Sequence, residues 1–303
     1  MGTADNLAEP AAAGRAAGAV QLRQLLAQGI DALHSHETNP PLAAGVLLAH
    51  VLNRPRAVLI THGELPIEPA AAARYRALVA RRVAGEPIAY LTGRREFWSL
   101  PLEVTPAVLI PRPETELVVE RALALLPGTQ DAAGDVRVAD LGTGSGAIAL
   151  ALASERPRWV LTATDQSEAA LAVARGNAAR LNLGHIEFLA GNWFAALTGR
   201  RFEAIVSNPP YVADGDPALA ALRHEPAGAL SAGPSGLEAL RHLIAGASVH
   251  LERNGWLLLE HGADQADPVA AALVAAGYAR VRCHCDLAGR DRVTEGRWLG
   301  VDP

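Results

Sequence analysis

Residues 136–146 have the sequence Val-Arg-Val-Ala-Asp-Leu-Gly-Thr-Gly-Ser-Gly, and Ala-Ile-Ala-Leu-Ala-Leu follows at residues 147–152. The apolar start predicts a buried strand, and the run after the glycines predicts a helix. Glycines at alternate positions allow a sharp turn and a close approach of the backbone to a ligand. The start of the helix adds N–H groups that have no partner within it. This stretch therefore predicts a ligand-binding loop between a strand and a helix of a parallel sheet.

Two carboxylates accompany this loop. Asp140 precedes the glycines, and Asp165 ends the next predicted strand, residues 159–164. A carboxylate about 20 residues after the glycines is the expected partner of ribose hydroxyls. NAD and S-adenosylmethionine both contain an adenosine ribose, so Asp165 does not separate them. Asp140 favours S-adenosylmethionine, because this carboxylate can brace the loop near the cationic amino-acid end of that molecule.

Further along the chain, Asn192 and Trp193 follow the predicted strand 186–189. At the end of a third strand, they are candidates to flank an adenine ring. The alternative for Trp193 is packing in the core.

Asn208-Pro209-Pro210-Tyr211 follows another apolar run, residues 204–207, and so marks the end of a further buried strand. The lone pair of an amide or exocyclic aromatic nitrogen is delocalised, which makes the nitrogen a poor nucleophile. A site assists it by accepting hydrogen bonds from its N–H groups and fixing its orientation. The Asn208 side-chain oxygen and the Pro209 carbonyl are suitable acceptors, and the prolines hold them rigidly. Tyr211 offers a flat face to a planar group. The alternative is an ordinary Asn-Pro turn.

The order of these motifs, each at a strand end, predicts a donor pocket and an acceptor pocket along one edge of a sheet. We therefore expect an S-adenosylmethionine-dependent N-methyltransferase with a seven-stranded α/β sheet of the Rossmann-like, class I type. Gly289-Arg290-Asp291 should join the last two strands in an antiparallel hairpin. The expected strands are residues 136–141, 159–164, 186–189, 202–207, 255–260, 280–286 and 292–299.

The remaining chain is expected to form three further parts. Residues 1–18 are rich in Ala and Gly and predict a disordered tail. Residues 19–92 show apolar spacing of helical period and predict a small helical bundle that binds the substrate. Residues 93–112 predict a β-hairpin linker, from which Phe97 or Trp98 reaches the acceptor pocket or packs in the hairpin. Residues 113–303 then form the methyltransferase domain.

Composition limits the classes of function. The chain has 303 residues, is 50% hydrophobic and carries a net charge of −5, which argues against a broad nucleic-acid footprint. No apolar run is long enough to cross a bilayer. Cys283 and Cys285 flank His284, which is too few ligands for a metal site, so we expect no metal and two reduced cysteines. We expect a cytoplasmic monomer without a membrane or nucleic-acid partner.

The chain resembles the peptide chain release factor glutamine methyltransferases, the PrmC/HemK family, from about Val20 to Gly300. The motif Asn-Pro-Pro-Tyr alone is shared with DNA adenine methyltransferases, but its combination with residues 110–116 is far more specific. The resemblance rests on residues 85–90 (Gly-Glu-Pro-Ile-Ala-Tyr), 95–98 (Arg-Glu-Phe-Trp), 110–116 (Ile-Pro-Arg-Pro-Glu-Thr-Glu), 140–149, 208–211, 223–226 (Arg-His-Glu-Pro), 259–262 (Leu-Glu-His-Gly) and 292–297.

This resemblance implies a substrate, the glutamine of the Gly-Gly-Gln loop of class-1 release factors, with S-adenosylhomocysteine as the second product. The helical domain would grip the release factor. The residues implied for the donor are Gly142, Thr143, Gly144, Ser145, Gly146, Asp165, Trp193 and Asn208, and those implied for the glutamine are Asn208, Pro209, Pro210 and Tyr211. Our interpretation of the residues adds Asp140 and Asn192 to the donor site and Phe97 to the glutamine site. Asn192 stands where many relatives carry Asp, but its amide oxygen can still accept a hydrogen bond from adenine.

Four alternatives remain at this point. A methyltransferase acting on a ribosomal-protein glutamine would share the motif and the two-domain plan. A DNA adenine methyltransferase is disfavoured by the acidic balance. A nicotinamide dehydrogenase would use the glycine loop but leave residues 208–211 without a role. A non-catalytic binding module would not need both pockets.

Overall fold

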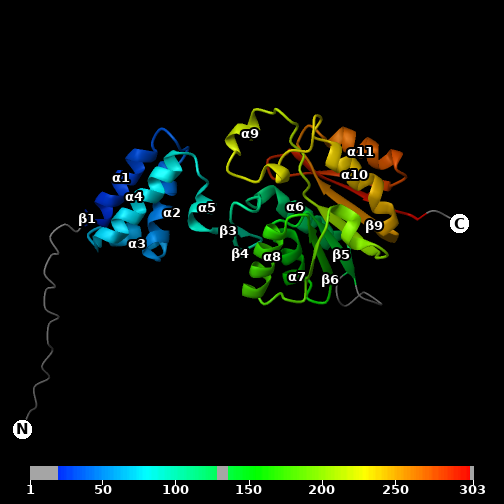
Figure 1. Cartoon of the computed structure of the whole chain (residues 1–303), viewed down its shortest axis with the longest axis horizontal. Helices are drawn as coiled ribbons and strands as arrows, with labels where there is room; N and C mark the ends of the chain where they lie inside the picture. The colour runs from blue at the N-terminus through cyan, green and yellow to red at the C-terminus, as the bar shows by residue number, and fades with distance from the viewer. Residues whose placement is uncertain (1–19, 128–135, 301–303) are drawn as a thin grey trace, which may run out of the picture. The chain divides into compact units, whose positions relative to one another are not determined.

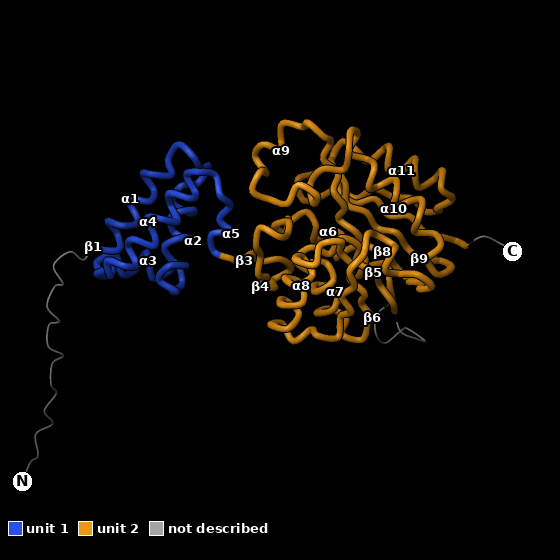
Figure 2. Tube along the Cα trace, viewed as in Figure 1, with its two compact units in different colours: residues 1–92 blue, residues 93–303 orange. Residues whose placement is uncertain are grey.

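A computed structural model describes residues 20–127 and 136–300 of the chain (Figure 1). The predicted tail, residues 1–18, lies outside the described residues. The chain divides into two compact units, residues 1–92 and 93–303 (Figure 2). Among the described residues, no helix combines the length and the apolar composition that a membrane span requires.

The first unit is a helical bundle, as its apolar periodicity predicts. Asn39 caps α2 by accepting a hydrogen bond from the Leu42 N–H at 3.1 Å, and Pro40 opens that helix, where a missing N–H costs nothing. Tyr75 and the leucines of α1 and α2 fill the core. The elements are β1 (Val20–Gln21), α1 (Leu22–Leu33), α2 (Pro40–Leu52), α3 (Arg56–Thr61), β2 (Pro66–Ile67), α4 (Pro69–Val83) and α5 (Ile88–Thr92).

The second unit begins with the predicted hairpin, which is shorter than the sequence alternation suggested. Its strands are β3 (Arg94–Phe97) and β4 (Leu100–Glu103). Trp98 and Ser99 form the connection with φ of 51° and 57°, the left-handed geometry that matches the twist of a two-residue hairpin turn. Residues 104–112 continue as a loop because the prolines at 106, 111 and 113 cannot supply ladder N–H groups.

A seven-stranded sheet in the order β10-β11-β9-β8-β5-β6-β7 forms the centre of this unit, which confirms the predicted fold class. Neighbouring strands from β9 to β7 pair in parallel, and β11 alone runs antiparallel, to both β9 and β10. The strands are β5 (Arg137–Leu141), β6 (Val160–Asp165), β7 (Glu187–Ala190), β8 (Phe202–Ser207), β9 (Leu251–Glu260), β10 (Ala279–Cys285) and β11 (Asp291–Arg297).

Helices cover both faces of the sheet (Figure 1). Val138 and Val206 face α6 and α7, whereas Ala139 and Ile205 face α10 and α11, as alternation along buried strands requires. The helices are α6 (Glu116–Leu125), α7 (Ala147–Glu155), α8 (Glu168–Arg180), α9 (Ala218–Ala221), α10 (Glu238–Ala247) and α11 (Ala266–Ala275), with short 3-10 turns η1 (Pro113–Thr115), η2 (Trp193–Leu197), η3 (Ala227–Ala229) and η4 (Ser248–His250).

Both cysteines lie on β10 and carry free thiols. Cys283 is half-buried and pairs in register with Thr294, while Cys285 is exposed. Burial raises the pKa of the Cys283 thiol, which keeps it protonated and unreactive. Within the described part of the chain, no cluster of three His, Cys, Asp or Glu side chains is placed to hold a metal.

Candidate active site

A cavity of about 570 Å³ opens where β5, β6, β7 and β8 end. The carboxyl edge of a parallel sheet is where ligands bind in this class of fold. Among the predicted residues, Gly142, Gly144, Asp165, Asn192, Trp193, Asn208 and Pro210 line it. Further lining comes from residues that the sequence did not single out individually: Ala107, Val108, Leu109, Pro226, Gly228, Ala229, Ser231, Ala232 and His242.

The glycine loop leaves open space at the cavity. Gly142 and Gly144 have φ of +72° and +56°, which L side chains rarely adopt. A Cβ built on Gly144 would meet nothing within 4 Å, so the missing side chain leaves a cradle for a ligand. Gly146 differs, because its Cβ would lie 2.9 Å from Leu150 Cδ1. Gly146 therefore lets α7 pack closely rather than lining the donor pocket.

Alanine substitutions should separate these two roles. We expect Gly146→Ala to lower the free energy of unfolding by about 2–4 kcal/mol, through strain at positive φ and overpacking. Gly144→Ala should cost only the strain, about 1–2 kcal/mol, but weaken donor binding by roughly ten-fold because the methyl group fills the cradle. Urea denaturation and isothermal titration calorimetry measure the two effects. Equal donor affinity for Gly144→Ala and the unchanged protein would contradict the assignment.

Asp140 lies behind the loop and is fully buried. Its Oδ2 accepts hydrogen bonds from the Thr143 hydroxyl at 2.6 Å and the Ala149 N–H at 3.2 Å, whereas Oδ1 has no partner. Burial raises the pKa of this carboxyl to about 7, although both hydrogen bonds lower it. A buried carboxylate oxygen without a partner favours a cationic ligand, which fits the ammonium group of S-adenosylmethionine.

Asp165 ends β6 at the cavity and is held in place by the backbone. Its Oδ2 accepts from the Gly144 N–H and its Oδ1 from the Ser167 N–H, both at 2.9 Å. Each carboxylate oxygen has a second lone pair. Asp165 is thus oriented by the glycine loop while still able to accept hydrogen bonds from ribose hydroxyls.

The far end of the cavity is aromatic. The Trp193 ring lies 3.5 Å from the Cβ position of Gly142, and the His242 ring centroid is 6.5 Å from that of Trp193. Asn192 lines the same region. No pattern in the sequence points to His242, because it lies on a helix 49 positions after Trp193 and does not follow a strand. This end suits a flat base bordered by an amide that hydrogen-bonds its edge.

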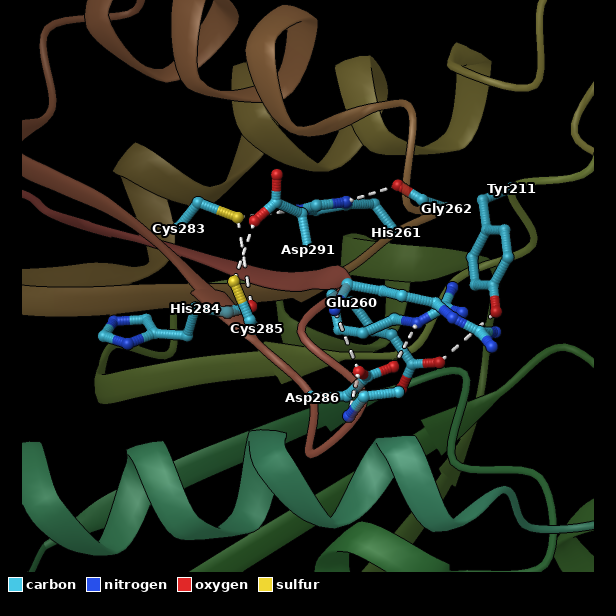
Figure 3. Close-up of polar contacts among 12 residues, drawn as sticks. Tyr211, Glu260, His261, Gly262, Cys283, His284, Cys285, Asp286 and Asp291 are labelled. Carbon is cyan, nitrogen blue, oxygen red and sulfur yellow. Dashed lines mark hydrogen bonds and ion pairs between the residues drawn. The ribbon is translucent and has the colours of Figure 1, made fainter.

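Asn208 stands at the cavity directly after β8. Its Nδ2 donates to the Thr115 hydroxyl oxygen at 3.0 Å, which leaves Oδ1 as the atom available to a substrate N–H. Pro209 is buried beside it. The hydroxyl of Tyr211 points toward Glu260 at 3.4 Å (Figure 3). Tyr211 is not among the residues that line the cavity, so its flat contact with the substrate stays a prediction.

Phe97 requires a correction. Its side chain is 1% exposed and belongs to the core that contains Leu102, Val118 and Val119. The expected contact with the substrate is therefore replaced by packing. Phe97 ends β3, and alternation turns it inward, while the half-buried Trp98 and the exposed Ser99 follow it in the turn.

A buried carboxylate ties two distant segments together at the cavity rim. Glu225 accepts from the Ile110 N–H at 3.0 Å and pairs with Arg112 at 2.5 Å. Residues 107–109 line the cavity, as do Pro226, Gly228, Ala229, Ser231 and Ala232, which follow Glu225 in the chain. Glu225 therefore holds the long loop after β8 against the segment before α6.

Removing this clamp should weaken donor binding. We expect Glu225→Ala to raise the donor Kd by about ten-fold, because the loop 212–234 loses the contact that holds it over the cavity. Glu203→Ala is a matched control. Glu203 also accepts from a backbone N–H and pairs with an arginine, both of Arg137, but it lies away from the cavity. Calorimetry should show an unchanged Kd for the control, and equal effects of the two variants would contradict the role of the clamp.

The sheet order and the cavity define a class I S-adenosylmethionine-dependent methyltransferase. Similarity to solved structures supports this fold. The hMettl16 catalytic domain matches with a TM-score of 0.55 at 18% identity, covering 78% of this chain and 83% of that one. A methyltransferase from Pyrococcus furiosus matches with a TM-score of 0.50 at 21% identity, covering 76% of this chain and 100% of that one.

Family models and curated relatives narrow the class. The PrmC N-terminal domain model matches residues 24–93 and the methyltransferase small domain model matches residues 119–235. A release factor glutamine methyltransferase of Xylella fastidiosa is 53% identical, covering 85% of this chain and 93% of the relative. The protein of that name from Escherichia coli is 44% identical, covering 92% and 99%. The chain belongs to the release factor glutamine methyltransferase family.

Proposed function

We propose that the chain transfers a methyl group to the side-chain amide nitrogen of the glutamine in the Gly-Gly-Gln loop of class-1 release factors, and so supports translation termination. The observation that carries this proposal is Asn208 at the cavity, with its Nδ2 engaged by Thr115 and its Oδ1 left for an amide N–H. A glutamine amide offers such N–H groups. Membership of the family supports the choice of glutamine and of release factors.

The residues of this chain promote the transfer by orienting the glutamine amide toward the methyl donor. Asn208 Oδ1 and the Pro209 carbonyl accept the two amide N–H bonds, which aims the nitrogen lone pair into the donor pocket. Pro209 and Pro210 hold these acceptors because their φ angles are fixed. S-adenosylmethionine supplies an electrophilic methyl group on sulfur. The new N–C bond forms as the S–C bond breaks, leaving S-adenosylhomocysteine, and the nitrogen then loses its proton to solvent.

The donor residues have distinct tasks in this proposal. Gly142 and Gly144 give room at the loop, and Asp140 behind them provides the negative charge for the ammonium group. Thr143 and Ser145 serve as parts of the same loop, with Thr143 bonded to Asp140. Asp165 accepts from the ribose, while Asn192 and Trp193 border the adenine.

The helical unit, residues 20–92, is proposed to bind the release factor away from the Gly-Gly-Gln loop, which would add affinity without touching the reacting atoms. The match of the PrmC N-terminal domain model to this unit supports the role. We further propose that the protein works as a monomer in the cytoplasm, where release factors act. The net charge of −5 favours a protein partner over direct nucleic-acid binding.

Mass spectrometry of a purified class-1 release factor, incubated with this protein and S-adenosylmethionine, tests the proposal. We expect one added methyl group on the Gly-Gly-Gln glutamine. Donor binding without methyl transfer would overturn the assignment of release factors as the substrate. Ribosomal proteins, and then DNA, would be the next substrates to test.

A further inference from the structure

A second buried carboxylate lies behind the acceptor motif, outside the donor pocket. Glu260 ends β9, is 1% exposed and meets the Tyr211 hydroxyl at 3.4 Å (Figure 3). Its other oxygen, Oε2, has no hydrogen bond of regular geometry. Glu260 does not line the cavity, and the transfer described above assigns it no part. A buried carboxylate is costly, so its position calls for a physical reason.

Thr115 connects this carboxylate to Asn208. The threonine is 4% exposed in η1, and its hydroxyl oxygen accepts the hydrogen bond from Asn208 Nδ2. The same hydroxyl faces Glu260 closely enough to lower the pKa of that carboxyl. A hydroxyl has a single proton. Once that proton points to the carboxylate, the oxygen can only accept from Asn208.

The direction of this chain of hydrogen bonds decides which end of the Asn208 amide meets the substrate. With the Thr115 proton directed to Glu260, Asn208 must turn its NH₂ group toward Thr115 and its Oδ1 toward the cavity. If the Thr115 proton were free to point to Asn208, the amide could flip and present NH₂ groups to the substrate. Two facing donors would then repel the glutamine amide instead of orienting it.

We propose that Glu260 and Thr115 are positioning residues that fix the Asn208 amide with its oxygen facing the acceptor site. This inference rests on the proposed role of Asn208 and extends it to two residues that touch neither donor nor substrate. Thr115 and Glu260 lie in residues 110–116 and 259–262, two of the segments on which the family resemblance rests.

The charge state of Glu260 sets the pH range in which Glu260 and Thr115 hold the Asn208 amide in one orientation. Burial raises the pKa of Glu260 to about 7, while Thr115, Arg292 and Tyr211 lower it and Glu114 raises it. Arg292 is itself paired with Asp286 at 3.2 Å. Above this pKa the carboxylate can only accept, and the chain of hydrogen bonds has one direction. Below it, the protonated carboxyl can donate to Thr115 and release the constraint.

Steady-state kinetics of the full chain at saturating donor, with a class-1 release factor, test the proposal first. We expect Thr115→Val to lower kcat by about ten-fold with donor Kd within two-fold, and Thr115→Ser to restore most of the kcat. Thr162→Val is the matched control, because Thr162 is a buried threonine of β6 whose hydroxyl bonds Glu187 at 3.3 Å, away from the cavity. An unchanged kcat for Thr115→Val, or an equal fall for the control, overturns the proposal.

The dependence of kcat on pH is a second test, because a purely structural role of Glu260 would not change it. We expect kcat to fall as the pH is lowered from 8 to 6, and Glu260→Gln to have a lower kcat that does not change over this range. The ¹⁵N resonance of the Asn208 side-chain amide, which needs no substrate, should shift with a midpoint near pH 7 in the unchanged protein and not in Glu260→Gln. A resonance that stays constant overturns the positioning role. Lack of transfer by the unchanged protein would instead indicate a different substrate.

Discussion

Asn208→Ala is expected to lower kcat by about 100-fold or more while the donor Kd stays within about three-fold. In the proposed mechanism this side chain is the acceptor that orients the glutamine amide, so its removal should leave the nitrogen lone pair unaligned with the methyl group. In the proposed site the donor is held mainly by the glycine loop, Asp140 and Asp165, whose hydrogen bonds do not involve Asn208. Quenched-flow or steady-state methylation of a release factor measures kcat, and calorimetry measures the Kd.

Asn192→Ala is the matched control for this prediction. It removes the same chemical group from the same cavity, but at the aromatic end beside Trp193. Its expected profile is the reverse, a weaker donor Kd with kcat at saturating donor little changed. Normal turnover of Asn208→Ala would falsify the proposed mechanism, and a shared profile of both variants would show that the two amides have no separate tasks.

The sequence predicts the parts of the site that follow buried strands. Asp140, Gly144, Asp165 and Asn208 each lie at or just after the end of an apolar run, and parallel strands bring such positions to one edge. The seven strands and the reversed β11 followed from the same patterns of apolar runs and turns. These features depend on short stretches of sequence, so they can be predicted from one sequence alone.

Side-chain partners across long separations did not follow from the sequence. The hydrogen bond from Asn208 to Thr115 spans 93 positions of the chain, and the one from Ile110 to Glu225 spans 115. Hydrophobic periodicity in the sequence does not predict such pairs. Phe97 shows the same limit, because an aromatic at the end of a short strand fits a pocket or a core equally well, and only packing against α6 decides. Gly146 belongs to the glycine motif, yet its contact with Leu150 is what requires a glycine.

Donor affinity should rise by about ten-fold between pH 6 and pH 8, and Asp140→Asn should abolish this rise. Without donor, burial holds the pKa of Asp140 at about 7, so at pH 6 most of the protein carries a neutral carboxyl. A cationic amino group favours the ionised form, so binding must displace this proton at pH 6 but not at pH 8. Asp140→Asn should also bind more weakly at pH 8, because the partner of the ammonium group is lost. Calorimetry in buffers of different ionisation enthalpy measures both the Kd and the proton released.

The stability of the donor-free protein should change with pH in the opposite direction. The pKa of Asp140 is raised in the folded state, so its contribution is present below pH 4 and is lost as pH rises through 7. Asp140→Asn should therefore gain stability relative to the unchanged protein at pH 8, where it binds donor poorly. Glu260→Gln is the control, because the pKa of Glu260 is also raised to about 7 but its side chain meets Tyr211, whereas Asp140 is bonded to Thr143 of the glycine loop. The Glu260→Gln variant should change the pH dependence of the Tm but leave the pH dependence of the donor Kd unchanged. If instead Asp140→Asn bound donor with the unchanged pH dependence, the unpaired Oδ1 would have no role in holding the ammonium group.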